Sequence, residues 1–166
     1  MADSGHTEPD TDLAWEVAIA AIKYTTLRGN ITQNSIFDKD KALSFEGDSG
    51  PYLQYTHARI CSVLEKAKLS GLSADVDLAP EKPYAVEHLI YIFPEVVKEA
   101  FLERAPHKVT GFLTELASAF NSFYAEEKIA DDTDTYAPYK IAVTEAVRQT
   151  IKNGLWILAI KAPERM

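Results

Sequence analysis

The chain has 166 residues, of which 46% are hydrophobic and 25% are charged, a composition typical of one globular domain with its own core. Its formal net charge of −8 disfavours a strongly electropositive surface, and its single cysteine, Cys61, excludes an internal disulfide. No apolar run approaches the roughly 20 residues that a membrane span requires, so we expect a cytoplasmic protein.

The negative charge is concentrated in two segments. Residues 1–12 are an acidic lead-in with four acidic side chains and no basic one, which we expect to be flexible. A later loop carries Asp131, Asp132 and Asp134. Removing these seven from the 25 acidic residues leaves 18 against 17 basic residues, a net charge of −1. A local basic face is therefore compatible with the composition.

The first part of the chain predicts one long helix and a linker. Residues 13–27 carry apolar side chains around almost the whole helical circumference, which is typical of a buried helix, and the sequence RGN ends it. Residues 30–50 show no regular period. Phe37 and Phe45 are the aromatic side chains that we expect to anchor this linker.

The rest of the chain predicts a series of helices. Capping residues and a proline start a helix that runs from residue 51 to about residue 69. Residues 84–104 keep a helical period through Pro94, where the missing backbone donor predicts two helices that meet at a bend. Two more helices are expected at residues 107–129 and 137–160. Since no segment alternates with a period of two, the predicted fold class is an all-α bundle.

The sequence carries no signature of a catalytic or metal site. Its four histidines have no cysteine or acidic partner at metal-ligand spacing, and it has no glycine-rich phosphate loop and no G-x-S-x-G motif. Cys61 lies in the core-facing half of its helix and is expected to be a buried thiol. No catalytic residue and no metal are therefore predicted, which favours a binding or structural module.

The helix predicted from residue 51 has two chemically different faces. At 100° per residue, one sector holds apolar residues and one histidine. The opposite sector combines two aromatic rings with two cations and a serine: Tyr52, Tyr55, Arg59, Ser62 and Lys66. Single-stranded RNA is recognised by such a face, because bases stack on the rings and cations hold phosphates. The same residues could also pack under a neighbouring helix, with Arg59 paired to an acid.

Several segments occur together and in a fixed order. They are VAIAAIKYTTLRGN, FDKDKALSFEGD, GPYLQYTHARICSVLEKA, HLIYIFPEVVKEA, LTELASAFNSFY and IAVTEAVRQTIKNGLWILAIKAPERM. Across about residues 15–166 they resemble the last stretch of the catalytic domain and the following C-terminal, DALR-type anticodon-binding domain of arginyl-tRNA synthetases. Ala20 and Ala159 stand where glycine is usual in that family, and Lys140 stands where arginine is usual.

The resemblance implies an anticodon-binding helical bundle of the class I aminoacyl-tRNA synthetases. Residues 13–46 would end the catalytic-domain connection, and residues 47–166 would form the DALR-type domain. Such enzymes use ATP to join arginine to tRNA(Arg), but the HIGH-like and KMSK-like motifs of their catalytic domain are absent from this chain. The chain alone is therefore expected to be inactive, with ATP and Mg²⁺ bound only by the missing catalytic domain. The implied partners are tRNA(Arg) and that domain, without DNA or membrane.

The resemblance also implies a set of site residues. Its motifs place the anticodon contacts at Tyr52, Tyr124 and Met166, with Tyr55 as a secondary candidate. Residues that could hold the tRNA backbone or support the site are Gln54, Arg59, Lys66, Arg148, Lys152 and Arg165. Because the body of the chain is nearly neutral, we expect weak and strongly salt-sensitive binding of tRNA by the chain alone.

Two other functions stay open from the sequence. A free-standing tRNA-binding adaptor would keep the same fold without the synthetase body. It is disfavoured because residues 17–30 resemble the connection to a catalytic domain. A protein-interaction module would use the tyrosine face for a partner protein, and a binding assay with intact and altered anticodon bases separates this function from the tRNA-binding one.

Overall fold

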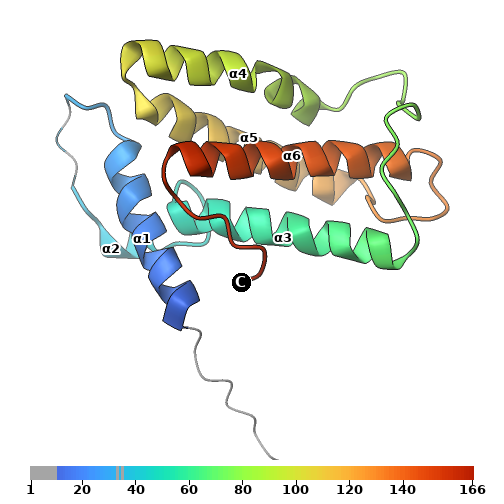
Figure 1. Ribbon diagram of the computed structural model, residues 1–166, viewed down its shortest axis with the longest axis horizontal. Coiled ribbons are helices and arrows are strands. Elements are labelled where there is room, and N and C mark those ends of the chain that lie inside the picture. The colour runs from blue at the N-terminus through green and yellow to red at the C-terminus, as the bar shows by residue number, and fades with distance from the viewer. Residues whose placement is uncertain (1–10, 33, 35) are drawn as a thin grey trace, which may run out of the picture.

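The computed structural model describes residues 11–32, 34 and 36–166, and this part of the chain is mostly helical (Figure 1). The helices are α1 Thr11–Leu27, α2 Lys39–Ala42, α3 Gly50–Leu69, α4 Ala85–Glu103, α5 Pro106–Glu126 and α6 Ala137–Ile157. No strand occurs in these described ranges. The predicted all-α fold class is confirmed.

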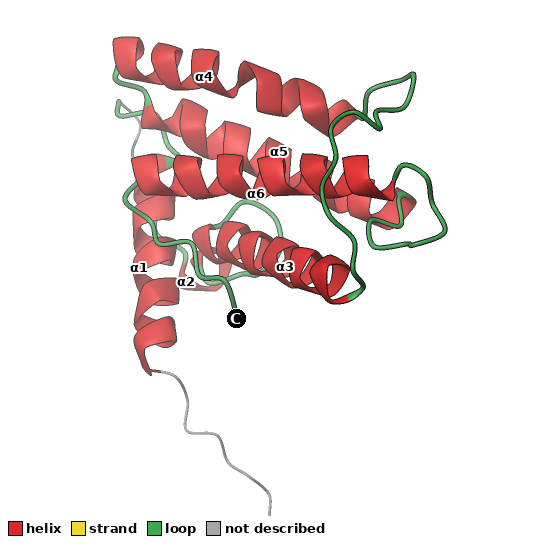
Figure 2. Cartoon of the chain, turned by 45° about the vertical axis from the view of Figure 1, so that its right-hand side comes forward, coloured by secondary structure: helices red, strands yellow, loops and turns green. Residues whose placement is uncertain are grey.

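Helices α3, α4, α5 and α6 run side by side, and α1 lies across one end of them (Figures 1 and 2). Helix α4 packs mainly on α5, whereas α3 packs on both α6 and α1. The core is drawn from all of these helices and includes Tyr24, Leu53, Ile60, Val86, Leu113, Phe120, Ile151 and Leu155. None of the described helices is long and apolar enough to cross a membrane.

The first turn of α3 lies in very close contact with the backbone of α1. Ser49 caps the helix by accepting a hydrogen bond from the backbone nitrogen of Tyr52 at 3.1 Å, and Pro51 fits the first turn because no donor is needed there. A Cβ atom on Gly50 would lie only 2.4 Å from the carbonyl oxygen of Ala20. Glycine is therefore required for this approach, which fixes the first turn of α3 against α1.

A polar network holds the same junction together. Tyr24 of α1 is fully buried, and its hydroxyl group donates to the Asp48 carboxylate and lies 2.6 Å from the hydroxyl of Thr114 on α5. Arg28 forms an ion pair with Asp48 at 3.3 Å. Burial, together with the neighbouring carboxylate, raises the pKa of Tyr24, so its hydroxyl keeps the proton that it donates. The end of α1, the start of α3 and the first half of α5 are thus joined.

One continuous helix replaces the two helices predicted around Pro94. Helix α4 passes through this proline, which lies on its exposed side, where water can reach the carbonyl that loses its partner. On the side toward α5, the ring of Phe93 packs against Phe112 with 5.3 Å between the centroids. The predicted break was wrong because packing against α5 on both sides of the proline outweighs its local cost of about 3 kcal/mol.

The N-terminal segment and the linker also differ from the prediction. Helix α1 begins at Thr11, so it includes the end of the predicted flexible lead-in at residues 1–12, whose first ten residues lie outside the described part. The linker contains the short helix α2, which Asp38 caps. Phe37 and Phe45 are about half exposed, so neither is a buried anchor.

Helices α5 and α6 each end three residues earlier than predicted, at residues 126 and 157 instead of 129 and 160. Helix α6 stops because Ala159 adopts a left-handed conformation with a φ of 55°, and the next backbone nitrogen donates back to the Leu155 carbonyl at 2.8 Å. This conformation suits glycine, in agreement with the glycine that is usual there in the resembling family.

Lys140 attaches the acidic loop to α6. Its ammonium group lies 2.6 Å from the Asp134 carboxylate and also pairs with Glu127, and only 6% of its side chain is exposed. Burial alone disfavours the charge, but the hydrogen bonds to the two carboxylates outweigh it and raise the pKa of Lys140. The lysine in turn lowers the pKa of Asp134. Lys140 and Asp134 are therefore charged together at neutral pH.

We expect Gly50→Ala to destabilise the fold, because the added methyl group overlaps backbone atoms of α1. Such overpacking lowers the free energy of unfolding by about 1–3 kcal/mol, measurable by urea denaturation. Gly111→Ala is the matched control, since no atom lies within 4 Å of the added Cβ atom on α5. In a helix interior this change raises the free energy of unfolding by about 1 kcal/mol. Equal effects of the two substitutions would contradict the close contact.

Lys140→Met is expected to lower stability at pH 7 and to change its pH dependence. Because the folded-state pKa of Asp134 is lowered, its ion pair stabilises the protein above the ordinary aspartate pKa, and this contribution is lost as pH falls through the folded value. The difference in the free energy of unfolding between wild type and variant is therefore expected to shrink between pH 7 and pH 3. A difference that stays constant over this range would show that the ion pairs contribute nothing.

Candidate nucleic-acid interface

The predicted tyrosine and cation face of α3 is divided between two neighbouring clusters. Tyr52 and Arg59 are half-buried against α5, whereas Tyr55 is 45% exposed beside the linker. On the opposite side of the helix, Leu53 and Ile60 are fully buried. The apolar face and the tyrosine and cation face of α3 are thus where the helical period places them. The rings of Tyr52 and Tyr55, however, lie in different surroundings, one against α5 and the other beside the linker.

The first cluster, here called the arginine platform, consists of Tyr52, Arg59, Asn121 and Tyr124. The guanidinium carbon of Arg59 lies 4.4 Å from the centroid of the Tyr124 ring, which is a cation–π contact. The Asn121 amide donates to the Tyr52 hydroxyl at 2.9 Å and accepts from Arg59 at 3.3 Å. Arg59 and Tyr124 are therefore held in one orientation while the tyrosine remains 36% exposed.

Asn121 was not among the residues predicted from the sequence. It lies three residues before Tyr124, a spacing that places both side chains on one side of α5. Arg59 pairs with this amide and with a ring rather than with an acid, so its guanidinium charge is not neutralised within the platform.

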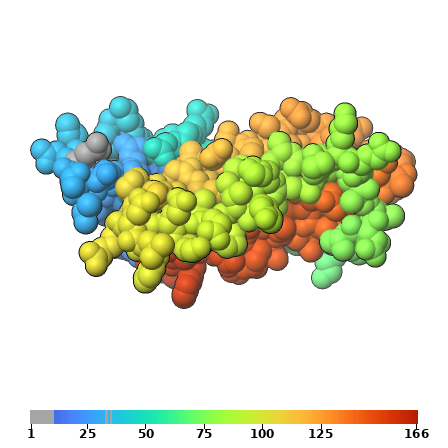
Figure 3. Space-filling model, turned by 90° about the horizontal axis from the view of Figure 1, so that it is seen from above, coloured from blue at the N-terminus to red at the C-terminus, as the bar shows by residue number. Residues whose placement is uncertain are grey.

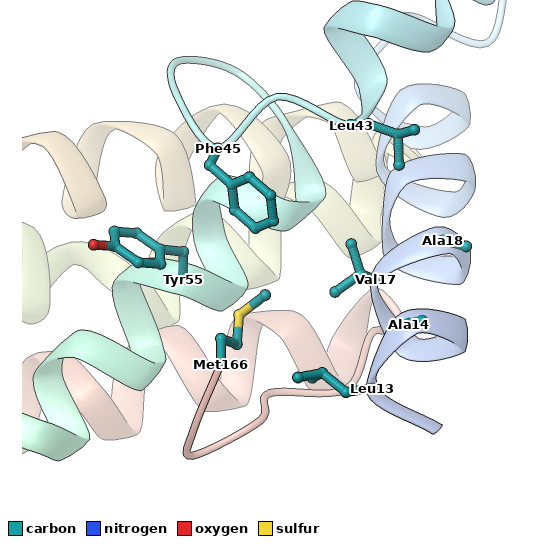
Figure 4. Close-up of a pocket in the computed structure, with 8 residues that line it drawn as sticks. All are labelled: Leu13, Ala14, Val17, Ala18, Leu43, Phe45, Tyr55 and Met166. Carbon is teal, nitrogen blue, oxygen red and sulfur yellow. The ribbon is translucent and has the colours of Figure 1, made fainter. Parts of the chain in front are cut away.

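The second cluster is an apolar pocket of about 560 Å³ at the junction of α1, α3 and the linker (Figure 4). Its lining residues are Leu13, Ala14, Val17, Ala18, Leu43, Phe45, Tyr55 and Met166. The Phe45 ring meets the Tyr55 ring edge-on with 6.2 Å between the centroids. Figure 4 shows Met166 between Tyr55 and the wall formed by α1, with the end of its side chain toward Phe45. Segments far apart in the sequence thus build one pocket, here called the Met166 pocket.

Two of the predicted cations lie beside the aromatic clusters. Arg59 belongs to the platform, and Lys66 is exposed about two turns further along α3. Lys66 and Tyr124 line the same hollow of about 440 Å³ between α3 and the end of α5. The same hollow is also lined by Lys128 and by three acidic residues, Glu127, Asp131 and Asp132, so its charge is mixed.

The other predicted cations lie elsewhere. Arg148 and Arg165 line a hollow of about 600 Å³ on another side of α3, toward α6. Lys152 lies 3.9 Å from Glu164, and Arg165 lies 3.2 Å from Glu65. The structure does not bring Arg148 or Lys152 to the tyrosines, and two of these three cations already have acidic partners.

Gln54 and Cys61 differ from their expected surroundings. Gln54 is fully buried and donates to the Lys161 carbonyl at 2.9 Å, so in this conformation it can support the site but cannot touch a ligand. Cys61, expected to be buried, is half-buried beside Arg148, and burial raises the pKa of its thiol. Its sulfur lies 3.9 Å from Nδ1 of His57, a contact that invites comparison with a catalytic cysteine and histidine pair.

This pair is not arranged as a nucleophile and its base. Nδ1 of His57 lies 2.8 Å from the Pro163 carbonyl, which can only accept, so this nitrogen carries the proton and cannot take one from Cys61. Within residues 11–32, 34 and 36–166, no group of three or more His, Cys, Asp or Glu side chains could hold a metal ion. The exposed rings, the thioether and the cations suit binding by stacking and charge.

Comparison with known protein families identifies the domain. Residues 53–166 match the family described as "DALR anticodon binding domain". The chain belongs to this family. The matched part of the DALR domain contains both Tyr124 and Met166, whereas α1 and Phe45, which complete the Met166 pocket, precede it.

Individual relatives agree over almost the whole chain. The arginine–tRNA ligase of Pyrococcus furiosus is 33% identical over 96% of the chain, and arginine–tRNA ligase 1 of Halalkalibacterium halodurans is 41% identical over 93%. The solved arginyl-tRNA synthetase of Thermus thermophilus matches 99% of the chain with a TM-score of 0.86 and 32% identity. This DALR domain chain spans only 27%, 29% and 29% of the lengths of these three proteins.

Proposed function

We propose that this chain is the C-terminal tRNA-binding portion of an arginine–tRNA ligase and that it binds the anticodon loop of tRNA(Arg). The observation that carries the proposal is that an aromatic pocket and an arginine platform adjoin on α3 of a DALR anticodon binding domain. Its named relatives over more than nine-tenths of the chain are arginine–tRNA ligases.

The two clusters provide different kinds of contact. The Met166 pocket offers apolar faces from Phe45, Tyr55 and Met166, on which an unstacked base of the loop gains about 1–3 kcal/mol. Arg59 is held over the ring of Tyr124, so its remaining N–H groups can donate to phosphate oxygens while the contact with the ring is kept. Apolar stacking accepts every base, so choice among bases requires polar edges near the pocket rather than the pocket itself.

Aminoacylation is assigned to the rest of a longer enzyme. Since the chain spans under a third of the length of its named relatives, we propose that ATP, Mg²⁺ and arginine are bound by the remaining part, in the cytoplasm. No aminoacylation by the chain alone is expected.

A second apolar surface supports the remaining part of the enzyme as a partner. Trp15, Ile19 and Ile22 follow each other at helical spacing on the outer side of α1, and they are 69%, 40% and 52% exposed. The opposite side, with Ala20 and Tyr24, is buried. A helix that is apolar on both sides belongs inside a larger body. Figure 3 shows this blue segment at the end of the molecule beside the yellow end of α4.

Anticodon binding is tested with an RNA hairpin that carries the anticodon arm of an arginine tRNA, measured at low salt. Tyr55→Ala and Tyr124→Ala remove exposed rings and are each expected to weaken binding by about 5- to 150-fold, which corresponds to one lost stack. Tyr91→Ala is the matched control, because this tyrosine is 82% exposed on α4 outside both clusters. Equal affinity for hairpins with intact and altered anticodon bases, or equal loss in all three variants, would refute the proposal.

The interface of α1 is tested in the longer enzyme. Ile19→Glu with Ile22→Glu is expected to change the free energy of unfolding of this chain by no more than about 0.5 kcal/mol, because both side chains are substantially exposed. In the longer enzyme the same pair is expected to lower the rate of arginylation at least tenfold. Leu69→Glu, at an 83% exposed position on α3, serves as the control. Full arginylation activity of the double variant would contradict the proposal that α1 contacts the remaining part of the enzyme.

A further inference from the structure

Residues 158–166 form a segment without regular secondary structure that follows α6, here called the C-terminal strap. It leaves the end of α6, runs past α1 toward α3, and places Met166 in the Met166 pocket (Figures 1 and 4). Leu158 and Ile160 near its start are buried, whereas Glu164, Arg165 and Met166 are exposed or partly so. Its last residues therefore depend on specific contacts to stay in place.

Two fully buried polar side chains of α3 hold the strap through its backbone. The Gln54 amide donates to the Lys161 carbonyl at 2.9 Å, and Nδ1 of His57 lies 2.8 Å from the Pro163 carbonyl. The two donors are three residues apart on α3, and the two carbonyls that they reach are two residues apart in the strap. Positions three apart on a helix share a face about 5–6 Å apart, and carbonyls two residues apart in an extended strand repeat at about 6.6 Å.

The other side-chain polar contacts of residues 161–166 are exposed ion pairs. Lys161 pairs with Glu16 at 2.7 Å, and Arg165 pairs with Glu65 at 3.2 Å, with more than three-quarters of the lysine and arginine side chains exposed. Exposed pairs of this kind contribute little, because water and salt screen them. The start of the strap is held by Leu158 and Ile160 in the core, and beyond them the two buried hydrogen bonds are the polar contacts least screened by water.

Neither Gln54 nor His57 is the side chain that would give its buried position the highest stability. Within the described residues, neither Oε1 of Gln54 nor Nε2 of His57 has a hydrogen-bond partner. Half-satisfied polar groups in a core are less stabilising than apolar residues of similar shape. The Gln54 amide also lies 3.5 Å from the Glu16 carbonyl of α1, but its shorter hydrogen bond and that of His57 are both directed at strap carbonyls. This indicates that these residues serve the position of the strap.

We infer that Gln54 and His57 are positioning residues that hold the C-terminal strap so that Met166 completes the wall of its pocket. The chain bends at Glu164, after the second buried contact, and this bend returns Met166 to Tyr55. Neither residue reaches the pocket itself. The consequence for RNA binding rests on the proposed function, whereas the effect on Met166 does not.

The inference is tested by the methyl signal of Met166 in protein labelled with ¹³C-methyl methionine. The chain has only two methionines, Met1 and Met166, and Met166→Ala assigns the signal. In the wild type we expect a nuclear Overhauser effect between the Met166 methyl group and the Tyr55 ring. Gln54→Leu and His57→Phe remove one donor each, and both are expected to abolish this effect.

Two control variants separate the buried contacts from general damage. His57→Asn keeps a donor at the position of Nδ1 and is expected to retain the Tyr55 contact. Lys161→Ala removes only the exposed pair with Glu16 and is also expected to retain it. If His57→Phe does not fold, Gln54→Leu alone decides the matter. Persistence of the Tyr55 contact in the folded variants that lack a donor would overturn the inference.

The anticodon hairpin supplies the second measurement. Gln54→Leu and His57→Phe are expected to lose as much affinity as Met166→Ala, on the order of fivefold or more, and His57→Asn is expected to restore it. A displaced Met166 with unchanged hairpin affinity, where Met166→Ala itself weakens binding, would overturn the positioning role. If the wild type does not distinguish intact from altered loops, the proposed function fails, and the Tyr55 contact still decides whether the strap is held.

A pH profile provides a readout that packing alone would not change. Burial lowers the pKa of His57, so the imidazole is neutral at pH 7 and donates through Nδ1. The charged and titratable groups around it are Arg148, Lys152, Glu164 and the thiol of Cys61. Protonation requires a pH below the ordinary histidine pKa of about 6.5 and places a charge in the core. Protonation adds a proton at Nε2 and leaves the Nδ1 donor in place, but it puts a charge without a partner in the core. We therefore expect the Tyr55 contact to be lost in the wild type only below the lowered pKa of His57, and to be retained in His57→Asn.

Discussion

The close contact between Gly50 and the backbone of α1 at Ala20 is the constraint on which the site depends. It leaves no space for a Cβ atom, so the first turn of α3 has one position relative to α1. The network of Tyr24, Asp48 and Thr114 ties the same junction to α5. Because the Met166 pocket has one wall from α1 and another from α3, any slippage of this junction would change its shape.

Helix α3 serves several neighbours with different faces. One face fills the core, a second carries the arginine platform and Tyr55, and a third holds the C-terminal strap through Gln54 and His57. The platform and the pocket are formed before any ligand arrives, so ligand binding does not have to order them and does not lose that conformational entropy. With a nearly neutral body, such preorganisation matters more than general attraction to phosphate.

Much of the fold follows from local patterns. The helical periods, the capping sequence at Ser49 and the position of Pro51 located α3, and apolar stripes located α5 and α6 to within three residues. The division into two helices at Pro94 was predicted wrongly, because helix propensity describes an isolated helix and does not include the packing of Phe93 on Phe112. The end of α6 depends on the backbone conformation of Ala159, which side-chain period does not specify.

By itself, the sequence determined the all-α class, the two faces of α3 and, through its resemblance, the tyrosines and Met166 as a common set. Only the tertiary structure decided which of them meet: Tyr52 and Tyr124 are connected through Asn121 and Arg59, and Tyr55 and Met166 line one pocket with Phe45. It also separated Arg148 and Lys152 from that face and turned Gln54 inward. Helical period places a side chain on a face. Which partner covers that face depends on contacts between residues far apart in the sequence, such as Gln54 and Lys161, which are 107 positions apart.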